Sequence, residues 1–304
     1  MKAFALVVLI ACSHGGTATT SVHELSPEEH RLALLPPNPQ IVVEIDLARL
    51  RKNAVVGETA TAALNALGTD SRVPGLPLSV LGSPLASADQ IVLAAYGVGT
   101  TAATTLTLVV TKSQVPNATQ IEDGLVALGP EEWIRQIEAR AALKPTEIPA
   151  AWRALRAHAE PKGATGAVAR VTANLSFDAR VALARMTGFE APPEQLSLWS
   201  DVADDFAVVI DAEANDPGDK TKKSARGLAH SLRQLFNTLA ESEVMRSLGV
   251  PTSFSDARLI QEGQWVRAVI DVGPRHLTRV ARRAREMWAP GSLPAEPEAT
   301  GSGS

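Results

Sequence analysis

The first candidate for chemistry is the glycine-rich segment 97–102. Its order Gly-Val-Gly-Thr-Thr-Ala has the spacing of a dinucleotide-binding loop and follows a β-prone run at 90–96. Such a loop needs a helix N-terminus next, because the N–H groups of the first helical turn bind the pyrophosphate. Residues 104–111 are instead rich in Thr, Leu and Val, which predicts a strand. We therefore predict the turn of a β-hairpin, with a nucleotide loop as the alternative.

A second candidate is the acidic stretch 211–219, in which side chains with oxygen atoms alternate with small residues. An EF-hand calcium loop needs Gly at its sixth position and Glu at its twelfth, and here these positions hold Asp216 and Lys222. The stretch is therefore predicted to be a solvated loop in which Asp216 or Asp219 caps the next helix. An irregular calcium site is the alternative.

The remaining reactive residue types show no catalytic or metal-binding spacing. None of the six histidines stands in a zinc-binding pattern, and the chain has no Gly-x-Ser-x-Gly elbow. Glu44 and Asp46 share a strand face, which predicts the wet edge of a half-buried sheet, with a carboxylate pair as the alternative. A scattered Ser/His/Asp set stays open, because triads are spatial. We expect no cofactor, no metal and no enzyme activity.

The composition excludes several other classes of protein. The chain has 304 residues, of which 45% are apolar, 20% charged and 4% aromatic, with a net charge of -4. These proportions are those of a globular protein, and the acidic balance argues against nucleic acid as a partner. The one cysteine excludes an internal disulfide and a thiolate zinc site.

That cysteine lies close behind an apolar N-terminal run. Lys2 is followed by the apolar residues 3–11 and then by Cys12, which is the order of a secretory signal. The run is too short to span a bilayer. A buried strand over residues 4–10 is the alternative.

Residues 9–12 read Leu-Ile-Ala-Cys and resemble the lipobox of bacterial lipoproteins. The resemblance implies that residues 1–11 are a signal peptide and that Cys12 is acylated, with palmitate among its chains, leaving 304 − 11 = 293 residues. Two or three acyl chains hold a soluble domain firmly at a membrane. Ser13, in place of Asp, implies the outer membrane of a Gram-negative bacterium.

Flexible segments are predicted at both ends of the folded body. Residues 12–40 contain a Gly pair, a Ser/Thr cluster and the prolines at 36, 37 and 39, which predicts a lipid-anchored flexible tether. Within it, Ser26 and Pro27 could begin a short helix. Residues 290–304 are rich in Pro, Gly, Ser and Glu and are predicted to be disordered.

The body alternates β-prone and helical segments. The pattern predicts an α+β fold, with a mostly antiparallel sheet and helices packed on one face. Residues 125–135 align with 269–279 as strand, Gly-Pro and helix. We therefore expect two units, 41–148 and 149–289, which could be duplicated β-α-β-β-α units. The longest helix is expected over 221–248, and the last helix carries arginines that we expect on a solvated face, with contact to anionic lipid as the alternative.

Three further segments resemble uncharacterised lipoproteins of myxobacteria and related deltaproteobacteria. They are residues 39–51, 94–99 and 197–205. The resemblance implies no activity. Together with the lipobox it favours a lipid-anchored, periplasm-facing binding or scaffolding module. Its partners would be the membrane, through Cys12, and an envelope protein or a small apolar ligand. The alternatives are a hydrolase with a dispersed active site and a carrier of apolar acyl cargo, whose cavity would open beside the helix over 221–248.

The anchor can be tested directly. Cys12→Ser removes the only sulfur that could be acylated, so we expect palmitate labelling to disappear and the protein to leave the membrane fraction or stay unprocessed. Palmitate labelling and membrane association that persist in Cys12→Ser would contradict the lipobox interpretation.

Overall fold

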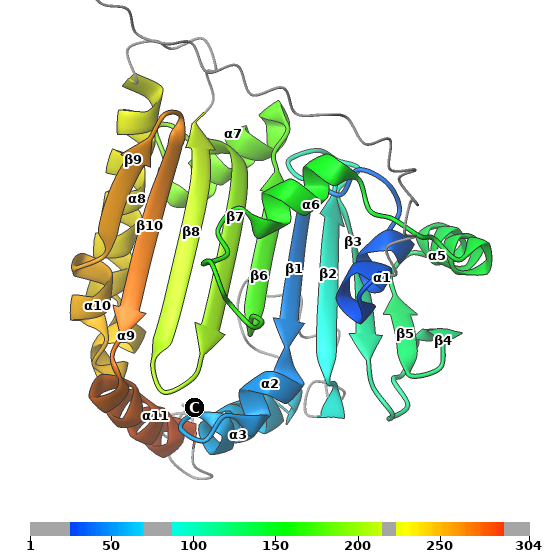
Figure 1. The fold of residues 1–304 in the computed structure, drawn as a ribbon, viewed down its shortest axis with the longest axis horizontal. Helices are drawn as coiled ribbons and strands as arrows, with labels where there is room; N and C mark the ends of the chain where they lie inside the picture. Colours follow the sequence, from blue (N-terminus) through cyan, green and yellow to red (C-terminus); the bar gives the residue numbers. More distant parts are fainter. Residues whose placement is uncertain (1–24, 70–86, 215–222, 289–304) are drawn as a thin grey trace, which may run out of the picture.

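A computed structural model describes residues 25–69, 87–214 and 223–288 (Figure 1). Several predictions lie outside these residues: the signal peptide 1–11, Cys12 and the start of the tether, the acidic residues Asp216 and Asp219, and the tail 290–304. Ten strands form one open antiparallel sheet in the order β4-β5-β3-β2-β1-β6-β7-β8-β10-β9. The α+β class and the antiparallel pairing are therefore confirmed.

The strands are β1 (Ile41–Asp46), β2 (Gln90–Tyr96), β3 (Thr104–Val110), β4 (Thr119–Glu122), β5 (Leu125–Leu128), β6 (Ala169–Asn174), β7 (Pro193–Val202), β8 (Phe206–Ala214), β9 (Arg258–Glu262) and β10 (Trp265–Val272). The helices are α1 (Pro27–Leu34), α2 (Leu47–Lys52), α3 (Gly57–Thr69), α5 (Glu131–Leu143), α6 (Ala150–Ala157), α7 (Phe177–Thr187), α8 (Lys223–Glu241), α9 (Glu243–Leu248), α10 (Pro251–Ser255) and α11 (Pro274–Trp288).

The two halves of the sheet repeat one strand order. Read outward from the central pair, the first half runs β1, β2, β3, β5, β4 and the second runs β6, β7, β8, β10, β9. The aligned segments 125–135 and 269–279 begin in β5 and β10, which hold equivalent places in the two halves. Because β1 pairs with β6, the two expected units share a single sheet.

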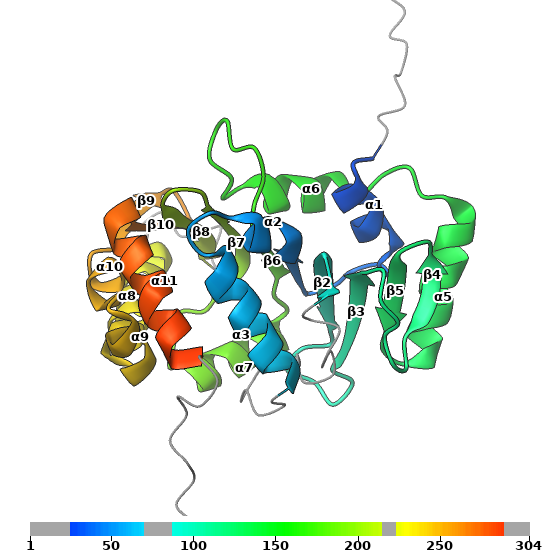
Figure 2. The same cartoon turned by 90° about the horizontal axis from the view of Figure 1, so that it is seen from below.

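Helices cover both faces of this sheet, so the prediction that they pack on one face is wrong. Directly paired residues point to the same side of a sheet. The front face, toward the viewer in Figure 1, carries Val42 and Ala94, against which α1 packs. The back face carries Ala212 and Val266, against which α8 packs. Figure 2 shows α1 and α6 on one side of the sheet and α7 on the other.

The sequence carries the signal for two covered faces. All four residues of β5 are buried, and consecutive residues of β2, Ile91 and Val92, are both buried. A strand with one wet face alternates between apolar and polar residues, whereas a strand that is covered on both faces reads as an apolar run.

Helix α1 overturns part of the predicted tether. Ser26 caps it as the sequence suggests: its Oγ accepts a hydrogen bond from the N–H of Glu29, whose carboxylate accepts one from the N–H of Ser26. Leu32 to Leu35 are buried in the core that α1 shares with the sheet and α5. The expectation of a flexible segment is therefore wrong for residues 27–35, because their apolar side chains complete the front-face core.

Polar side chains divide the helical segments at two places, one of them within the expected helix over 221–248. The Oδ1 atom of Asn53 accepts hydrogen bonds from the N–H groups of Val55 and Val56, which ends α2 and turns the chain into α3. Ser242 caps α9 through the N–H of Met245 and so separates α9 from α8. Asn and Ser compete for backbone hydrogen bonds in this way, which favours helix ends over helix interiors.

The strands β4 and β7 have no counterpart among the predicted elements. Strand β7 begins at Pro193 and carries both polar Ser197 and apolar Trp199 on the front face. Because one face mixes polar and apolar residues, the sequence lacks the regular apolar–polar alternation that predicts a strand. Around 97–99 the structure has the predicted β-hairpin between β2 and β3. Gly99 has a φ of +84°, and a Cβ there would lie 2.3 Å from the carbonyl oxygen of Asp178, so close packing on α7 requires glycine.

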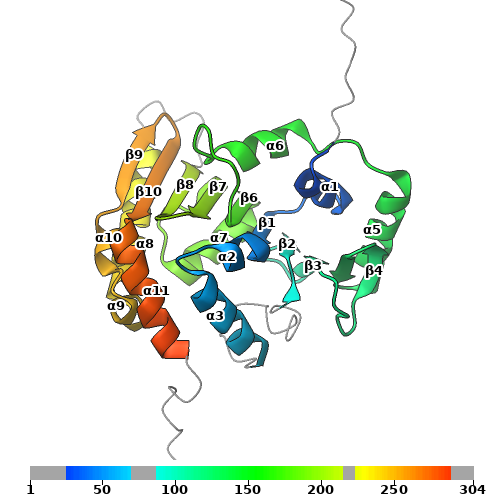
Figure 3. The same ribbon diagram turned by 60° about the horizontal axis from the view of Figure 1, so that its bottom comes forward.

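The last helix joins the two halves at the lower end of the sheet (Figure 3). Helix α11 lies beside α3, and the hydroxyl of Thr59 donates a hydrogen bond to the carbonyl of Ala281. Leu277, Ala281 and Ala284 are buried, whereas Arg275, Arg279, Arg282 and Arg285 are exposed. The predicted solvated arginine face is therefore present, and contact with lipid stays a prediction.

Candidate functional site

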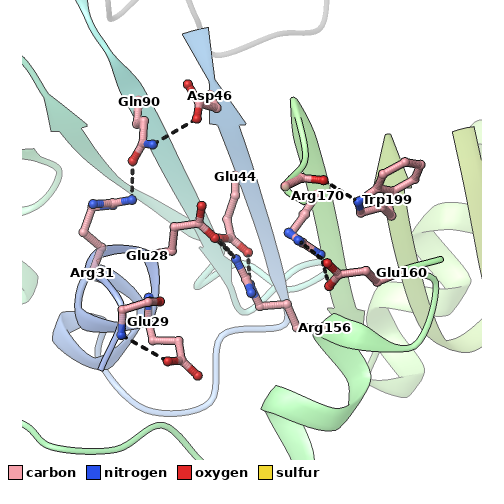
Figure 4. A network of polar contacts seen from close by, with 12 residues as sticks. Glu28, Glu29, Arg31, Glu44, Asp46, Gln90, Arg156, Glu160, Arg170 and Trp199 are labelled. Atoms are coloured by element: carbon pink, nitrogen blue, oxygen red, sulfur yellow. Dashed lines mark hydrogen bonds and ion pairs between the residues drawn. The ribbon is translucent and has the colours of Figure 1, made fainter. Parts of the chain in front are cut away.

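Charged side chains lie buried between the front face and the helices α1 and α6 (Figure 4). Arg156 of α6 donates from Nε and Nη2 to the two carboxylate oxygens of Glu44, at 2.7 and 2.9 Å. It also donates to Glu28 of α1 at 2.7 Å. The side chains of Arg156 and Glu44 are each only 12% exposed. One guanidinium thus links both helices to the central strand β1.

The electrostatics of this link favour the charged form of Arg156. Burial alone lowers the pKa of the Arg156 guanidinium, but the hydrogen bonds and charges of Glu44 and Glu28 outweigh burial and raise it. The pKa of Arg31 is lowered, because burial dominates over the nearby carboxylates of Glu28 and Glu44. Arg31 donates to the side chain of Gln90, which in turn donates to Asp46 at 3.2 Å.

Glu44 and Asp46 therefore do not lie at a wet sheet edge, and that prediction is wrong. The strand β1 is central in the sheet, and Arg156, 112 residues further along the chain, covers Glu44. The Oδ1 of Asp46 accepts a hydrogen bond from the N–H of Arg49 and caps α2. The cavity between these side chains measures about 20 Å³, which holds roughly one water molecule and no larger ligand.

A second buried cluster brings a histidine to an aspartate. Asp211 is 1% exposed and accepts hydrogen bonds from Arg267 at 2.8 and 2.6 Å. The Nδ1 of His158 lies 2.8 Å from the same carboxylate, and the His158 ring stacks on Trp265 at a centroid distance of 3.9 Å. This is the closest approach in the described residues to the scattered Ser/His/Asp set left open by the sequence.

The cluster lacks the geometry of a catalytic triad. Ser197 is paired with Asp211 across β7 and β8, but it is fully buried. Its Oγ accepts a hydrogen bond from the N–H of Ala159 and donates to the carbonyl of Arg156. A triad needs the serine on the histidine nitrogen that faces away from the aspartate. Arg267 also donates hydrogen bonds to both oxygens of the Asp211 carboxylate. The arrangement is therefore that of a structural ion pair.

A cleft of about 750 Å³ lies at the upper end of β6. The end of α1 and the chain leading to β1 form one wall, α6 forms the second, and the start of α7 forms the third. Most of its lining is apolar: Leu32, Leu35, Pro36, Pro37, Pro39, Ile148, Pro149, Trp152, Leu155, Leu175 and Phe177. Its size falls within the range of small-molecule pockets.

The proline wall of the cleft is held in place by side chains of the core. The hydroxyl of Tyr96 donates to the carbonyl of Pro36 at 3.0 Å. Arg140 of α5 donates twice to the carbonyl of Ala33, at 2.9 and 2.8 Å. Gln40 donates to the Oγ of Ser176, the cap of α7, at 2.7 Å. Three separate elements thus fix the segment that reads as a tether in the sequence.

The polar lining of the cleft contains no catalytic constellation. Its charged residues are Arg140, Arg180 and Glu194, and it has no histidine. No residue of α8 lines it, so it does not open beside the helix over 221–248, where the carrier alternative would place its cavity. The sequence signal for the position of this cleft was the apolar run at 32–35 directly before the prolines.

The histidines of the described residues serve as local contacts. His30 lies 3.0 Å from the carboxylate of Glu122, His230 is exposed on α8, and His276 contacts the carbonyl of Gly249. Within residues 25–69, 87–214 and 223–288, no three metal-binding side chains are grouped to hold an ion. No helix in these same ranges has the length and hydrophobicity needed to cross a bilayer.

Comparison with known proteins gives a distant structural similarity only. No protein-family model and no curated protein matches the chain. Crystal form III of TP0453, a Treponema lipoprotein, has a TM-score of 0.43 at 7% identity, covering 83% of this chain and 97% of that chain. Crystal form I has a TM-score of 0.40 at 7% identity, covering 83% and 96%. A likeness this distant is one of layout, and no function passes from TP0453 to this chain.

The Tyr96 contact gives a test of the cleft wall. Burial raises the pKa of Tyr96 well above its ordinary value, against a smaller opposing effect of Arg140. Because the pKa of Tyr96 is higher in the folded chain than in the unfolded chain, the neutral phenol stabilises the fold at pH values below the pKa of the unfolded chain, which is about 10. This stability is lost as the pH rises further. Tyr96 is the only tyrosine, so phenolate absorbance reports on it alone. We expect no phenolate near about pH 10 until the chain unfolds.

The matched control is the same titration in denaturant, where the unfolded chain should ionise near about pH 10. Phenolate that forms at this pH in the native chain, with its circular dichroism unchanged, would contradict the buried Tyr96–Pro36 contact.

Proposed function

We propose that this chain is a lipid-anchored protein of the bacterial cell envelope and acts as a non-catalytic, periplasm-facing binding module. Cys12 is its acylated anchor, and Ser13 directs it to the outer membrane. The lipobox resemblance of residues 9–12 supports the anchor. The body binds its ligand in the cleft between α1, α6 and α7.

The observation that carries the binding role is the cleft itself. It measures about 750 Å³, whereas the charged cavity beneath α1 measures about 20 Å³. Its lining is mostly apolar with a few polar groups, which is the usual composition of a small-molecule site. Burial of an apolar ligand surface there would supply binding free energy.

The same lining favours the carrier of apolar cargo over the hydrolase among the alternatives. A hydrolase needs a nucleophile and a base that face a common space. The Oγ of Ser176 in the cleft accepts hydrogen bonds from Gln40 and from the N–H of Ala179, and the lining has no histidine to act as its base. The one His–Asp contact of the described residues, His158 with Asp211, lies outside the cleft lining.

The test fills the cleft with a bulky side chain. The full chain with Cys12→Ser, which cannot carry acyl chains of its own, should bind the neutral fluorescent probe N-phenylnaphthylamine. Ala151 is exposed and lines the cleft, so Ala151→Trp should weaken probe binding by about tenfold or more. Fluorescence titration measures the Kd.

Ala154→Trp is the matched control, because Ala154 is exposed on the same helix and does not line the cleft. Binding that is equally strong in the Ala151→Trp and Ala154→Trp chains would place the probe elsewhere and refute the cleft as the binding site.

A further inference from the structure

Arg180 is one of several half-buried arginines without an ion pair. Arg31 and Arg140 donate instead to the Gln90 side chain and to the Ala33 carbonyl, whereas the Arg180 side chain has no such acceptor within the described residues. Arg49, Arg156, Arg170 and Arg267 each form an ion pair with a carboxylate. The side chain of Arg180, on α7, forms no ion pair and no hydrogen bond within the described residues, and its Nε is buried without a hydrogen-bond partner. Within the described residues, the guanidinium makes a cation–π contact with the Phe177 ring, whose centroid lies 5.9 Å from the guanidinium carbon. A buried donor left without a partner costs free energy.

The position of Arg180 matters as much as its lack of a partner. Phe177 and Arg180 line the large cleft and also a second groove of about 350 Å³, whose walls include Val181, Ala184 and Pro192. Phe177 is 70% exposed. An unpaired cation thus lies where two mostly apolar hollows meet.

The other charges of the two hollows leave this cation uncompensated. Glu194 lines the large cleft and Glu190 the small groove, but neither lies within ion-pair distance of Arg180. Arg140, also in the large cleft, directs Nε and Nη2 to the carbonyl of Ala33. A planar guanidinium at an apolar site selects a carboxylate or phosphate, because its N–H groups match the oxygens of these anions.

We propose, on the basis of the binding function above, that the ligand is a single-chain amphiphile with an anionic end group. Its alkyl chain lies along the apolar wall formed by α6 and the proline segment. Its carboxylate or phosphate accepts hydrogen bonds from the guanidinium of Arg180. The ligand therefore supplies the hydrogen-bond acceptor and the counter-charge that the described part of the chain does not give Arg180.

Three twelve-carbon probes separate the contribution of the end group from that of the alkyl chain. Laurate, dodecyl phosphate and dodecanol are titrated into the full chain with Cys12→Ser, below their micelle concentrations, by isothermal calorimetry. We expect Arg180→Gln to weaken binding of the anionic probes by about tenfold to hundredfold and to leave dodecanol binding unchanged. Preference for laurate or for dodecyl phosphate identifies the source of the anion, and either preference supports the proposal.

Arg185→Gln is the matched control, because Arg185 is exposed on the same helix and lines neither hollow. Thermal melting verifies that each variant is folded. Anionic probes that bind equally to the Arg180→Gln and parent chains, with dodecanol also bound, would overturn the role of Arg180 and leave the binding cleft intact. Failure of all three probes to bind the parent chain would overturn both proposals.

Discussion

The contact on which the rest of the front face depends is the pair between Arg156 and Glu44. It connects α6 to the central strand, and the second arm of Arg156 reaches α1 through Glu28. Transfer of two charges from water to a protein interior is costly, and removal of one partner alone leaves the other uncompensated. Geometry that satisfies both carboxylate oxygens therefore fixes where α1 and α6 lie. The cleft lies between these two helices and the start of α7, over the upper end of the sheet.

This dependence links the predicted anchor to the proposed binding site. Helix α1 is the first described element, so it is the part of the fold closest in sequence to Cys12. It contributes Glu28 to the ion pairs of Arg156 and Leu34 to the core. Leu32 and the residue that follows the helix, Leu35, line the cleft. An apolar ligand bound there would lie next to the described residues that are closest in sequence to the predicted anchor.

Local patterns predicted most of the elements but not the strands β4 and β7, nor the layers in which the elements pack. Ser26, Ser176 and Gly188 mark helix ends through short-range hydrogen bonds and backbone conformation, so they are visible in the sequence. The burial of Glu44 under Arg156 cannot be read from the local sequence, because Arg156 is distant in sequence. The prolines at 36, 37 and 39 are typical of a linker, and contacts with Tyr96, Arg140 and Ser176, from other elements, show that this segment is a wall. The unpaired state of Arg180 likewise depends on the tertiary structure.

The most direct test of the central claim is a double-mutant cycle on Arg156 and Glu44, measured as the free energy of unfolding of the full chain in urea. Arg156→Met alone leaves Glu44 buried without its partner, so we expect a loss of about 3–5 kcal/mol. Arg156→Met combined with Glu44→Leu removes both charges, so the double variant should be more stable than the Arg156→Met chain. Losses from the two single substitutions that simply add in the double variant would contradict the account, because they would show that this pair does not hold the helices.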